Sequence, residues 1–180
     1  MKLIIVIALA LPALAHAASP SPYAGQESRP IKALSPSEQA DLLAGKGMGL
    51  AKAAELNGYP GPAHVLDLAS ELALSSEQIA ATRTLFASME GRAKDLGRQL
   101  VAAEQALDDL FSSKQVTATE LERSLARIGD IQAKVRATHL SAHLEQARIL
   151  SAEQNASYAR LRGYSQPGAS SEGHEHGHKH

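Results

Sequence analysis

Two long runs of mainly apolar residues, spaced alternately three and four apart, dominate the middle of the chain. The first run contains Ile79, Thr82, Phe86, Met89, Ala93, Leu96, Leu100, Ala103, Leu107 and Leu110. The second contains Leu121, Leu125, Ile128, Gln132, Val135, His139, Ala142, Gln146 and Ile149. Because this spacing places every member of a run on one stripe of a helix, each run predicts a long helix that packs against a partner. We expect the two helices to pack antiparallel around a turn near residues 112–116.

Four capping boxes predict where helices begin. Ser35, Ser75, Thr117 and Ser151 are each followed three residues later by Glu or Gln, which is the pattern that satisfies free backbone N–H groups at a helix start. Residues 57–62 (Asn-Gly-Tyr-Pro-Gly-Pro) indicate a helix stop and a turn, with a short helix over about 62–73. The Gly-rich residues 45–49 lack the Gly-Lys-Ser/Thr ending of a phosphate-binding loop and are interpreted as a flexible joint.

The predicted fold class is all-α: an elongated antiparallel helical hairpin with short flanking helices. Few aromatic residues are available for its core, so we expect a homodimer to cover part of the apolar surface. The helical-hairpin domain is expected over residues 34–164. The flanking residues 18–33 and 165–180 are rich in Ser, Pro, Gly and His and are expected to be disordered.

The N-terminal residues have the layout of a signal peptide. Lys2 precedes an apolar run from Leu3 to Leu14, and Ala15-His16-Ala17 supplies small residues for cleavage after Ala17. A run of 12 apolar residues is too short to cross a bilayer, which takes about 20 residues in a helix. We therefore expect residues 1–17 to be removed on export, with the periplasm as the destination.

Composition and motifs exclude several classes of function. The chain has no Cys, so it has neither disulfides nor thiolate ligands. Its near-neutral net charge argues against nucleic-acid binding. It contains no Gly-x-Ser-x-Gly elbow, His-Glu-x-x-His motif, P-loop or dinucleotide fingerprint, and its acidic residues have helix-surface spacing. We therefore expect no enzymatic activity and no catalytic residues.

The histidines are the candidate functional residues. His139 and His143 lie four apart on a predicted helix, so their rings share a face and can bind one metal ion. The alternative is that one ring is a polar seam residue and the other is solvated. In an antiparallel pair, position 143 faces about position 87, and a fold-back at Leu74 brings His64 close to position 85, so all three rings converge. The candidate further ligands are Asp67, Glu71, Met89, Glu90 and Glu145.

The C-terminal residues 173–180 interleave histidine with other residues. We expect His174, His176, His178 and His180 to bind a borderline divalent metal, with Zn first and Ni, Co or Cu as alternatives. The binding should weaken below about pH 6, because imidazole must be neutral to act as a ligand. The alternative interpretation is a solubilising tail.

Two Leu-Ser-x-x-Gln segments, at residues 74–78 and 150–154, resemble the LTxxQ motifs of the Spy/CpxP periplasmic proteins, with Ser in place of Thr. The signal peptide, the helices and the His-rich tail are similar to the layout of zinc resistance-associated proteins, and residues 57–66 resemble a stretch of periplasmic heavy-metal sensors. The resemblance covers about residues 35–165.

This resemblance implies a helical hairpin, often dimeric, with two recurring activities: heavy-metal binding or sensing in metal or envelope-stress resistance, and ATP-independent chaperoning of unfolded proteins. The implied partners are metal ions, with unfolded proteins or a membrane-bound sensor as further candidates. The cobalt–nickel sensor of this superfamily carries a His and a Met four apart. Here His143 stands in place of that Met, and His64 is alone where that family has a His pair, so the metal preference stays open.

Overall fold

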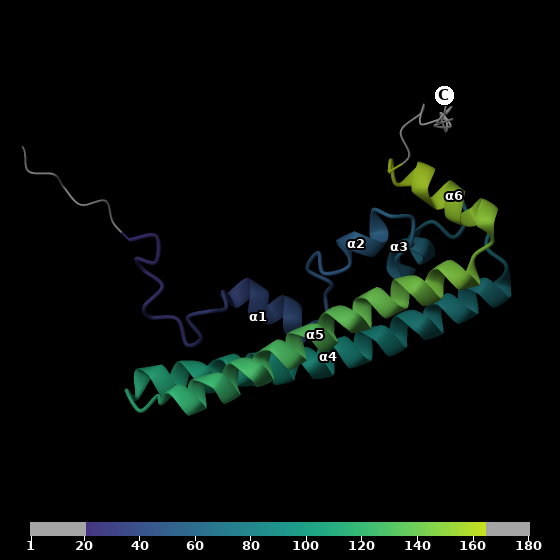
Figure 1. Ribbon diagram of the computed structural model, residues 1–180. Helices are drawn as coiled ribbons and strands as arrows, with labels where there is room; N and C mark the ends of the chain where they lie inside the picture. The colour runs from purple at the N-terminus through teal and green to yellow at the C-terminus, as the bar shows by residue number, and fades with distance from the viewer. Residues whose placement is uncertain (1–20, 165–180) are drawn as a thin grey trace, which may run out of the picture.

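The computed structural model describes residues 21–164, which form six helices and no strand (Figure 1). The helices are α1 (Pro36–Leu43), α2 (Lys52–Glu55), α3 (Pro62–Asp67), α4 (Ser76–Ser112), α5 (Ala118–Ile149) and α6 (Ala152–Leu161). The predicted all-α fold class is confirmed. The predicted signal peptide at 1–17 and the histidine tail at 165–180 lie outside the described residues. Within the described residues, no helix combines the length and the hydropathy that crossing a bilayer requires.

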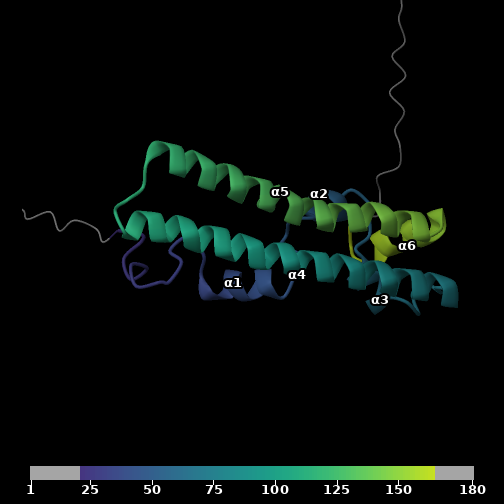
Figure 2. The same ribbon diagram turned by 90° about the horizontal axis from the view of Figure 1, so that it is seen from below.

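Helices α4 and α5 are the longest elements and lie side by side in opposite directions (Figures 1 and 2). They contain 37 and 32 residues, so each is roughly 50 Å long at about 1.5 Å per residue. A tight connection that includes Lys114 at a positive φ of 58° joins them. The shorter helices pack along this pair, and the described part of the molecule is elongated as a result.

The α4 stripe matches the sequence pattern, whereas the α5 stripe differs at two positions. All ten positions of the first run are buried or half-buried. In the second run Leu125 is 51% exposed and Gln132 is exposed, while Ile131 is buried instead. Ile131 belongs to the apolar cluster that also contains Leu42 of α1 and Leu100 of α4.

The C-terminal end of α1 lies very close to the backbone of α4. A Cβ atom on Gly97 would overlap the carbonyl group of Leu42. Because no side chain fits in that space, glycine is required where these helices meet.

Residues 21–33 correct the prediction that residues 18–33 are disordered. They form turns rather than a helix, and Ile31 is only 3% exposed. The backbone N–H of Lys32 donates to Asp108 of α4 at 3.2 Å, and the ammonium group of Lys32 lies 2.8 Å from the same carboxylate. One apolar anchor and one ion pair therefore hold a segment whose composition is typical of disorder.

The four predicted capping boxes are confirmed at α1, α4, α5 and α6. The structure also joins the two Leu-Ser-x-x-Gln segments: Gln78 donates to the side-chain oxygen of Gln154 at 2.7 Å and to the carbonyl of Ile149 at 2.9 Å. Both leucines of the segments pack in one apolar cluster, whose members are Val65, Leu72, Leu74, Leu150, Tyr158, Leu68 and Tyr164. Each glutamine thus caps its own helix and ties the ends of α4 and α6 together.

The connection before α4 departs from the sequence prediction in two ways. Helix α3 ends at Asp67 rather than near residue 73, because residues 68–73 form turns, and Leu72 and Leu74 pack in the apolar cluster. The short helix α2 was not predicted. It follows the glycine-rich segment, in which Met48 has a positive φ of 46°.

Candidate metal centre

His139 and His143 lie on the buried face of α5, one helical turn apart. His139 is 4% exposed and His143 is 9% exposed. The opposing register is set by Gln146, which donates to the hydroxyl of Thr82 across the pair at 3.1 Å. Both rings are therefore buried near α4, close to the register that the sequence indicates.

The ring of His143 is held by the turn at residues 57–61. Its Nδ1 lies 2.8 Å from the carbonyl oxygen of Tyr59. Because a carbonyl only accepts, Nδ1 carries the hydrogen, and in the neutral ring Nε2 keeps its lone pair. A backbone carbonyl on one ring nitrogen is the usual way in which proteins orient a histidine that binds metal through the other.

His139 is buried with one ring nitrogen unused. Its Nε2 is inaccessible to solvent and has no hydrogen-bond partner in the structure. Burial, followed by the neighbouring His143, lowers the pKa of His139 below its ordinary value. The ring is therefore neutral near pH 7, as a metal ligand must be.

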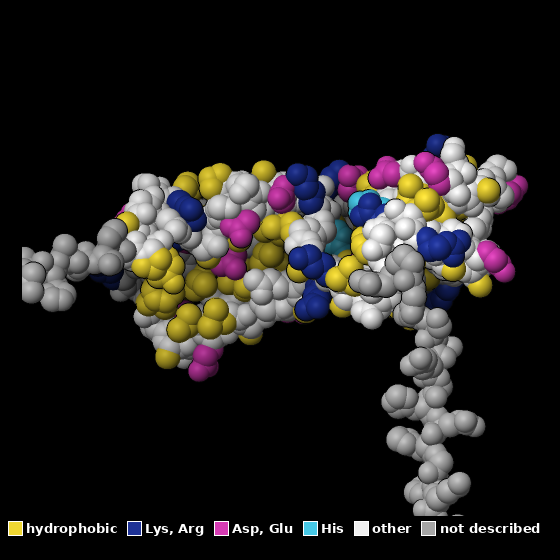
Figure 3. Space-filling view, turned by 90° about the horizontal axis from the view of Figure 1, so that it is seen from above, with side chains coloured by type: hydrophobic (Ala, Val, Ile, Leu, Met, Phe, Trp, Pro, Cys, Tyr) yellow, Lys and Arg dark blue, Asp and Glu magenta, His cyan; other side chains and the backbone are white. Residues whose placement is uncertain are grey.

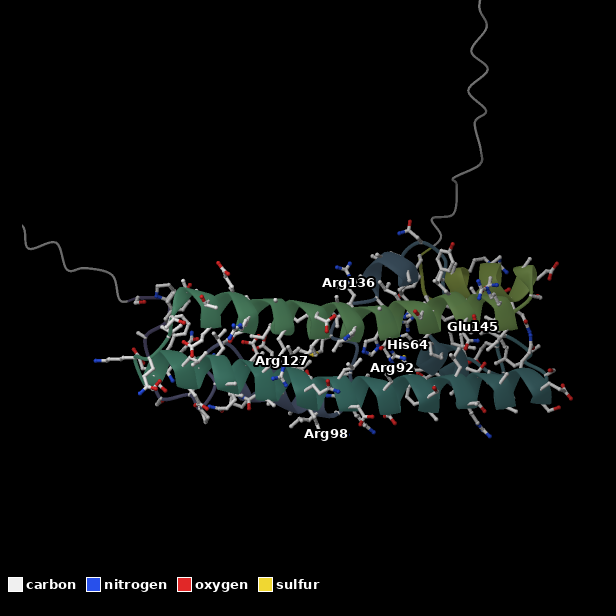
Figure 4. All side chains as sticks on the ribbon, turned by 60° about the horizontal axis from the view of Figure 1, so that its bottom comes forward. His64, Arg92, Arg98, Arg127, Arg136 and Glu145 are labelled. Carbon is white, nitrogen blue, oxygen red and sulfur yellow. The ribbon has the colours of Figure 1, made fainter. Side chains whose placement is uncertain are left out.

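His64 reaches the same place from α3. Two overlapping hollows of about 310 and 280 Å³ share Gly47, His64, His139 and His143 in their walls, and we call them together the histidine pocket. The side chain of His64 is 46% exposed, and its Nδ1 lies 3.7 Å from a carboxylate oxygen of Asp67. Figure 4 shows His64 over the space between α4 and α5, and Figure 3 shows histidine side chains in a recess beside Lys and Arg.

The histidine pocket thus brings together the three helical histidines that the sequence singles out. As they stand, no three or more His, Cys, Asp or Glu side chains among residues 21–164 are positioned to hold a metal ion. The predicted tail ligands His174, His176, His178 and His180 lie outside the described residues.

The carboxylates and the thioether considered from the sequence divide into two groups. Met89 and Glu90 line the histidine pocket, and Glu90 also forms an ion pair with Lys94 at 3.0 Å. Asp67 lies beside His64, whereas Glu145 pairs with Arg148 at 2.7 Å and Glu71 is exposed outside the pocket wall.

Glu55 is the residue that sequence reasoning missed. It lies at the end of α2, lines the histidine pocket and has a side chain only 13% exposed. Its Oε2 lies 3.5 Å from Nδ1 of His143 but receives no hydrogen bond, because that N–H donates to Tyr59. Nothing local distinguishes this residue from the other acidic residues of the chain, since its burial comes entirely from the fold.

The other oxygen of Glu55 binds α6 and the residues after it. The hydroxyl of Tyr158 donates to Oε1 at 2.5 Å and the hydroxyl of Tyr164 donates at 3.1 Å, while Nε of Arg162 lies 3.6 Å away. Tyr158 is 1% exposed. Burial, together with the carboxylate, raises the pKa of Tyr158 far above its ordinary value, so the hydroxyl keeps its proton and remains a donor.

Comparison of the chain with protein-family models, with curated proteins and with solved structures found no match in any of the three. Its family is therefore not shown by comparison, and the function must be argued from the histidine pocket itself.

Proposed function

We propose that this chain is a periplasmic heavy-metal-binding or metal-sensing protein, acting in metal or envelope-stress resistance, and that the histidine pocket is its structured metal centre. The observation that carries the proposal is the pair of buried imidazoles on α5. His143 has its Nδ1 hydrogen committed to a backbone carbonyl, and His139 has a buried Nε2 without a partner. A buried ring nitrogen without a hydrogen bond costs free energy, and a metal ion bound to that nitrogen in its deprotonated tautomer would recover it.

The chemistry of the donors favours a borderline divalent metal. Neutral imidazole suits Zn, Cu, Ni and Co, and a chain without Cys offers no thiolate to select softer ions. Zn is the first candidate. His64 supplies a third nitrogen if its half-exposed side chain turns toward the other two, a rotamer change on the short helix α3.

The antiparallel pair of long helices, with joined Leu-Ser-x-x-Gln segments and short flanking helices, is compatible with a Spy/CpxP-like hairpin. Under this proposal the tail histidines bind metal ions with little selectivity, and the histidine pocket discriminates between different metal ions. The periplasmic location in this proposal rests on the signal-peptide pattern of residues 1–17.

Metal titration tests the histidine pocket if the competing histidines of the C-terminal tail are first replaced. We would use the chain carrying His174→Ser, His176→Ser, His178→Ser and His180→Ser, called here the tail-substituted chain, and measure Zn²⁺ binding by calorimetry. Adding His139→Ala or His143→Ala should weaken binding at least tenfold, because each removes a nitrogen ligand. Lys134→Ala, an exposed charge change on the same helix outside the histidine pocket, is the matched control and should leave the affinity close to that of its parent. Equal affinities of the His139→Ala variant and its parent would refute the histidine pocket as a metal centre.

An ATP-independent chaperone is the second candidate, and an apolar groove favours it. The groove has a volume of about 560 Å³, and its wall includes Leu34, Met48, Leu50, Leu100 and Val135. Met48 also lines the histidine pocket, so the two sites share a wall. Surfaces of this kind bind apolar segments loosely.

Aggregation of a reduced, unfolded client protein, measured with and without Zn²⁺, separates the two functions. Protection that is independent of metal and survives His139→Ala favours the chaperone. Tight metal binding without protection favours metal sensing or storage.

A further inference from the structure

The two carboxylate oxygens of Glu55 have different environments. Oε1 is surrounded by donors from α6 and beyond, namely the hydroxyls of Tyr158 and Tyr164 and the guanidinium of Arg162. Oε2 is buried on the side of the histidine pocket and accepts nothing. One oxygen of this carboxylate accepts hydrogen bonds, whereas the other is buried without a hydrogen-bond donor. A buried carboxylate oxygen of this kind is stabilised when a cation or a proton binds to it.

Glu55 and His143 converge on one point beside Gly61. A methyl group built on Gly61 would stand 3.3 Å from Oε2 of Glu55, 3.3 Å from Nε2 of His143 and 3.0 Å from Cε1 of the same ring. The free oxygen of Glu55 and the lone-pair nitrogen of His143 therefore border the same small space. Zinc–oxygen and zinc–nitrogen bonds are about 2.0–2.2 Å long, so an ion shared by the two atoms requires both side chains to move toward it.

We propose that Glu55 is the oxygen ligand of the histidine pocket, and that Tyr158, Tyr164 and Arg162 form the outer shell that orients it, so that binding of a divalent metal ion fastens α6 to the centre. This inference rests on the proposed metal-binding function. It adds an oxygen ligand, Glu55, and a helix, α6, whose docking depends on metal binding. The resulting donor set is mixed nitrogen and oxygen, which is suited to Zn²⁺, Co²⁺ and Ni²⁺ rather than to Cu⁺.

The geometry explains how metal binding reaches α6. Outer-shell donors hold a ligand carboxylate in position and are worth about 10–100-fold in metal affinity. By linkage, whatever α6 contributes to metal binding, the metal contributes equally to the docking of α6. Tyr158 is the main contact, since it is 1% exposed and its hydroxyl donates to Oε1 of Glu55 at 2.5 Å.

The first test compares two carboxylates that line the histidine pocket. In the tail-substituted chain, Glu55→Gln should weaken Zn²⁺ binding at least tenfold, because the amide keeps the shape but loses the negative charge. Glu90→Gln is the matched control, since Glu90 lies on the wall and is neutralised by Lys94. It should leave the affinity unchanged. If Glu55→Gln binds as tightly as its parent while His139→Ala does not, Glu55 is not a ligand and the proposed metal-binding function still stands. If His139→Ala also binds normally, the proposed function itself fails.

The second test measures α6 directly. Hydrogen exchange of the amides at 152–161 should slow on addition of Zn²⁺ in the tail-substituted chain and be unaffected by Zn²⁺ in its Glu55→Gln and Tyr158→Phe derivatives. Tyr164→Phe, at a half-buried position, provides a milder change should Tyr158→Phe unfold the helix. Exchange that ignores Zn²⁺ in the parent, at saturating metal, would overturn the coupling to α6.

Two glycines of the pocket wall give a steric test of the shared space. Gly61→Ala places a methyl group against Glu55 and His143 and should reduce Zn²⁺ affinity several-fold. Gly47→Ala places its methyl group 3.7 Å from the ring of His139, an ordinary contact, and should change the affinity little. Equal effects of the two substitutions would contradict the assignment of the ion to the space between Glu55 and His143.

Discussion

The two ends of the α4–α5 pair have different interiors. Toward the connecting turn the core is almost entirely aliphatic: Leu42, Leu96, Leu100, Ala103, Ile128, Ile131 and Val135. Toward the other end the buried positions of the pair include Thr82, Thr138, His139, His143 and Gln146. Glu104 is the polar exception in the aliphatic half, and burial raises its pKa. The interface between α4 and α5 is therefore aliphatic in one half and polar in the other.

The difference between the two halves indicates that one contributes mainly to stability and the other mainly to ligand binding. Burial of an aliphatic side chain contributes about 1.5–3 kcal/mol without needing any particular partner. A buried hydrogen bond contributes only about 0.5–1.5 kcal/mol net, and a missing partner costs as much or more. The aliphatic half accordingly supplies stability, while the polar half supplies lone pairs and carboxylates that are free to meet a ligand.

The largest effect is expected from Leu100→Ala, which leaves a cavity in the aliphatic half. Truncation of a buried leucine costs about 2–5 kcal/mol, and Leu100 is 5% exposed. Leu125→Ala is the control: it belongs to the same kind of sequence stripe but is 51% exposed, so the cost should stay within about 0.5 kcal/mol. Urea unfolding followed by circular dichroism measures both. Similar midpoints for the two variants would contradict the aliphatic half as the source of stability.

Gly97→Ala should disrupt the same half from the α1 side. The added methyl group would overlap the backbone of Leu42, and an overpacked contact of this kind costs about 1–3 kcal/mol. Gly91→Ala, on the same helix with nothing within 4 Å, should instead stabilise the protein by about 0.5–1 kcal/mol. Opposite shifts in the melting temperature are expected, and shifts of the same sign would argue against the close contact between α1 and α4.

In the polar half, pairs should matter more than single residues. Thr82→Val removes the acceptor of the Gln146 amide and should cost about 1–3 kcal/mol, because both residues are fully buried. The double variant Thr82→Val, Gln146→Leu should recover most of that loss, since no polar group is then left without a partner. A double-mutant cycle in urea measures the coupling. Simple additivity of the two costs would show that the hydrogen bond is not the cause.

The smallest effect is expected from acidification of the metal-free protein. Burial lowers the pKa of His139, so between that lowered value and the ordinary value of 6.5 the unfolded chain binds a proton that the folded chain does not. Stability should therefore fall as the pH drops below about 6.5. In the His139→Gln variant, the part of the slope between pH 6.5 and 5 that His139 causes should disappear. A slope identical in the two proteins would place its origin elsewhere.

Local patterns in the sequence were sufficient for much of the fold. A capping box needs only four consecutive residues, and all four boxes form as predicted. The stripe of α4 depends on spacing along a single helix, and it too is buried as expected. The shared pocket of His64, His139 and His143 followed from counting residues on either side of a turn.

The sequence prediction was wrong at several positions whose burial depends on a distant segment. Ile131 rather than Gln132 is buried, which spacing along α5 alone does not indicate, and residues 21–33 are ordered because Ile31 is buried and Lys32 binds Asp108 of α4. The candidate carboxylate ligands that the sequence suggests lie near the histidines in the predicted register, and Glu55, the ligand proposed above, is not among them. Glu55 lies at the end of α2, a four-residue helix that no strong sequence pattern predicts.

The sequence by itself thus determines the two long helices, the four capped helix starts, the stripe of α4 and the presence of paired imidazoles, since all of these arise from neighbours within a few residues. Only the tertiary structure decides which lone pairs stay without a partner. That outcome depends on Tyr59 reaching His143, on Tyr158 and Tyr164 reaching Glu55, and on no donor reaching Nε2 of His139. These contacts join residues up to 109 positions apart, and no local pattern can encode them.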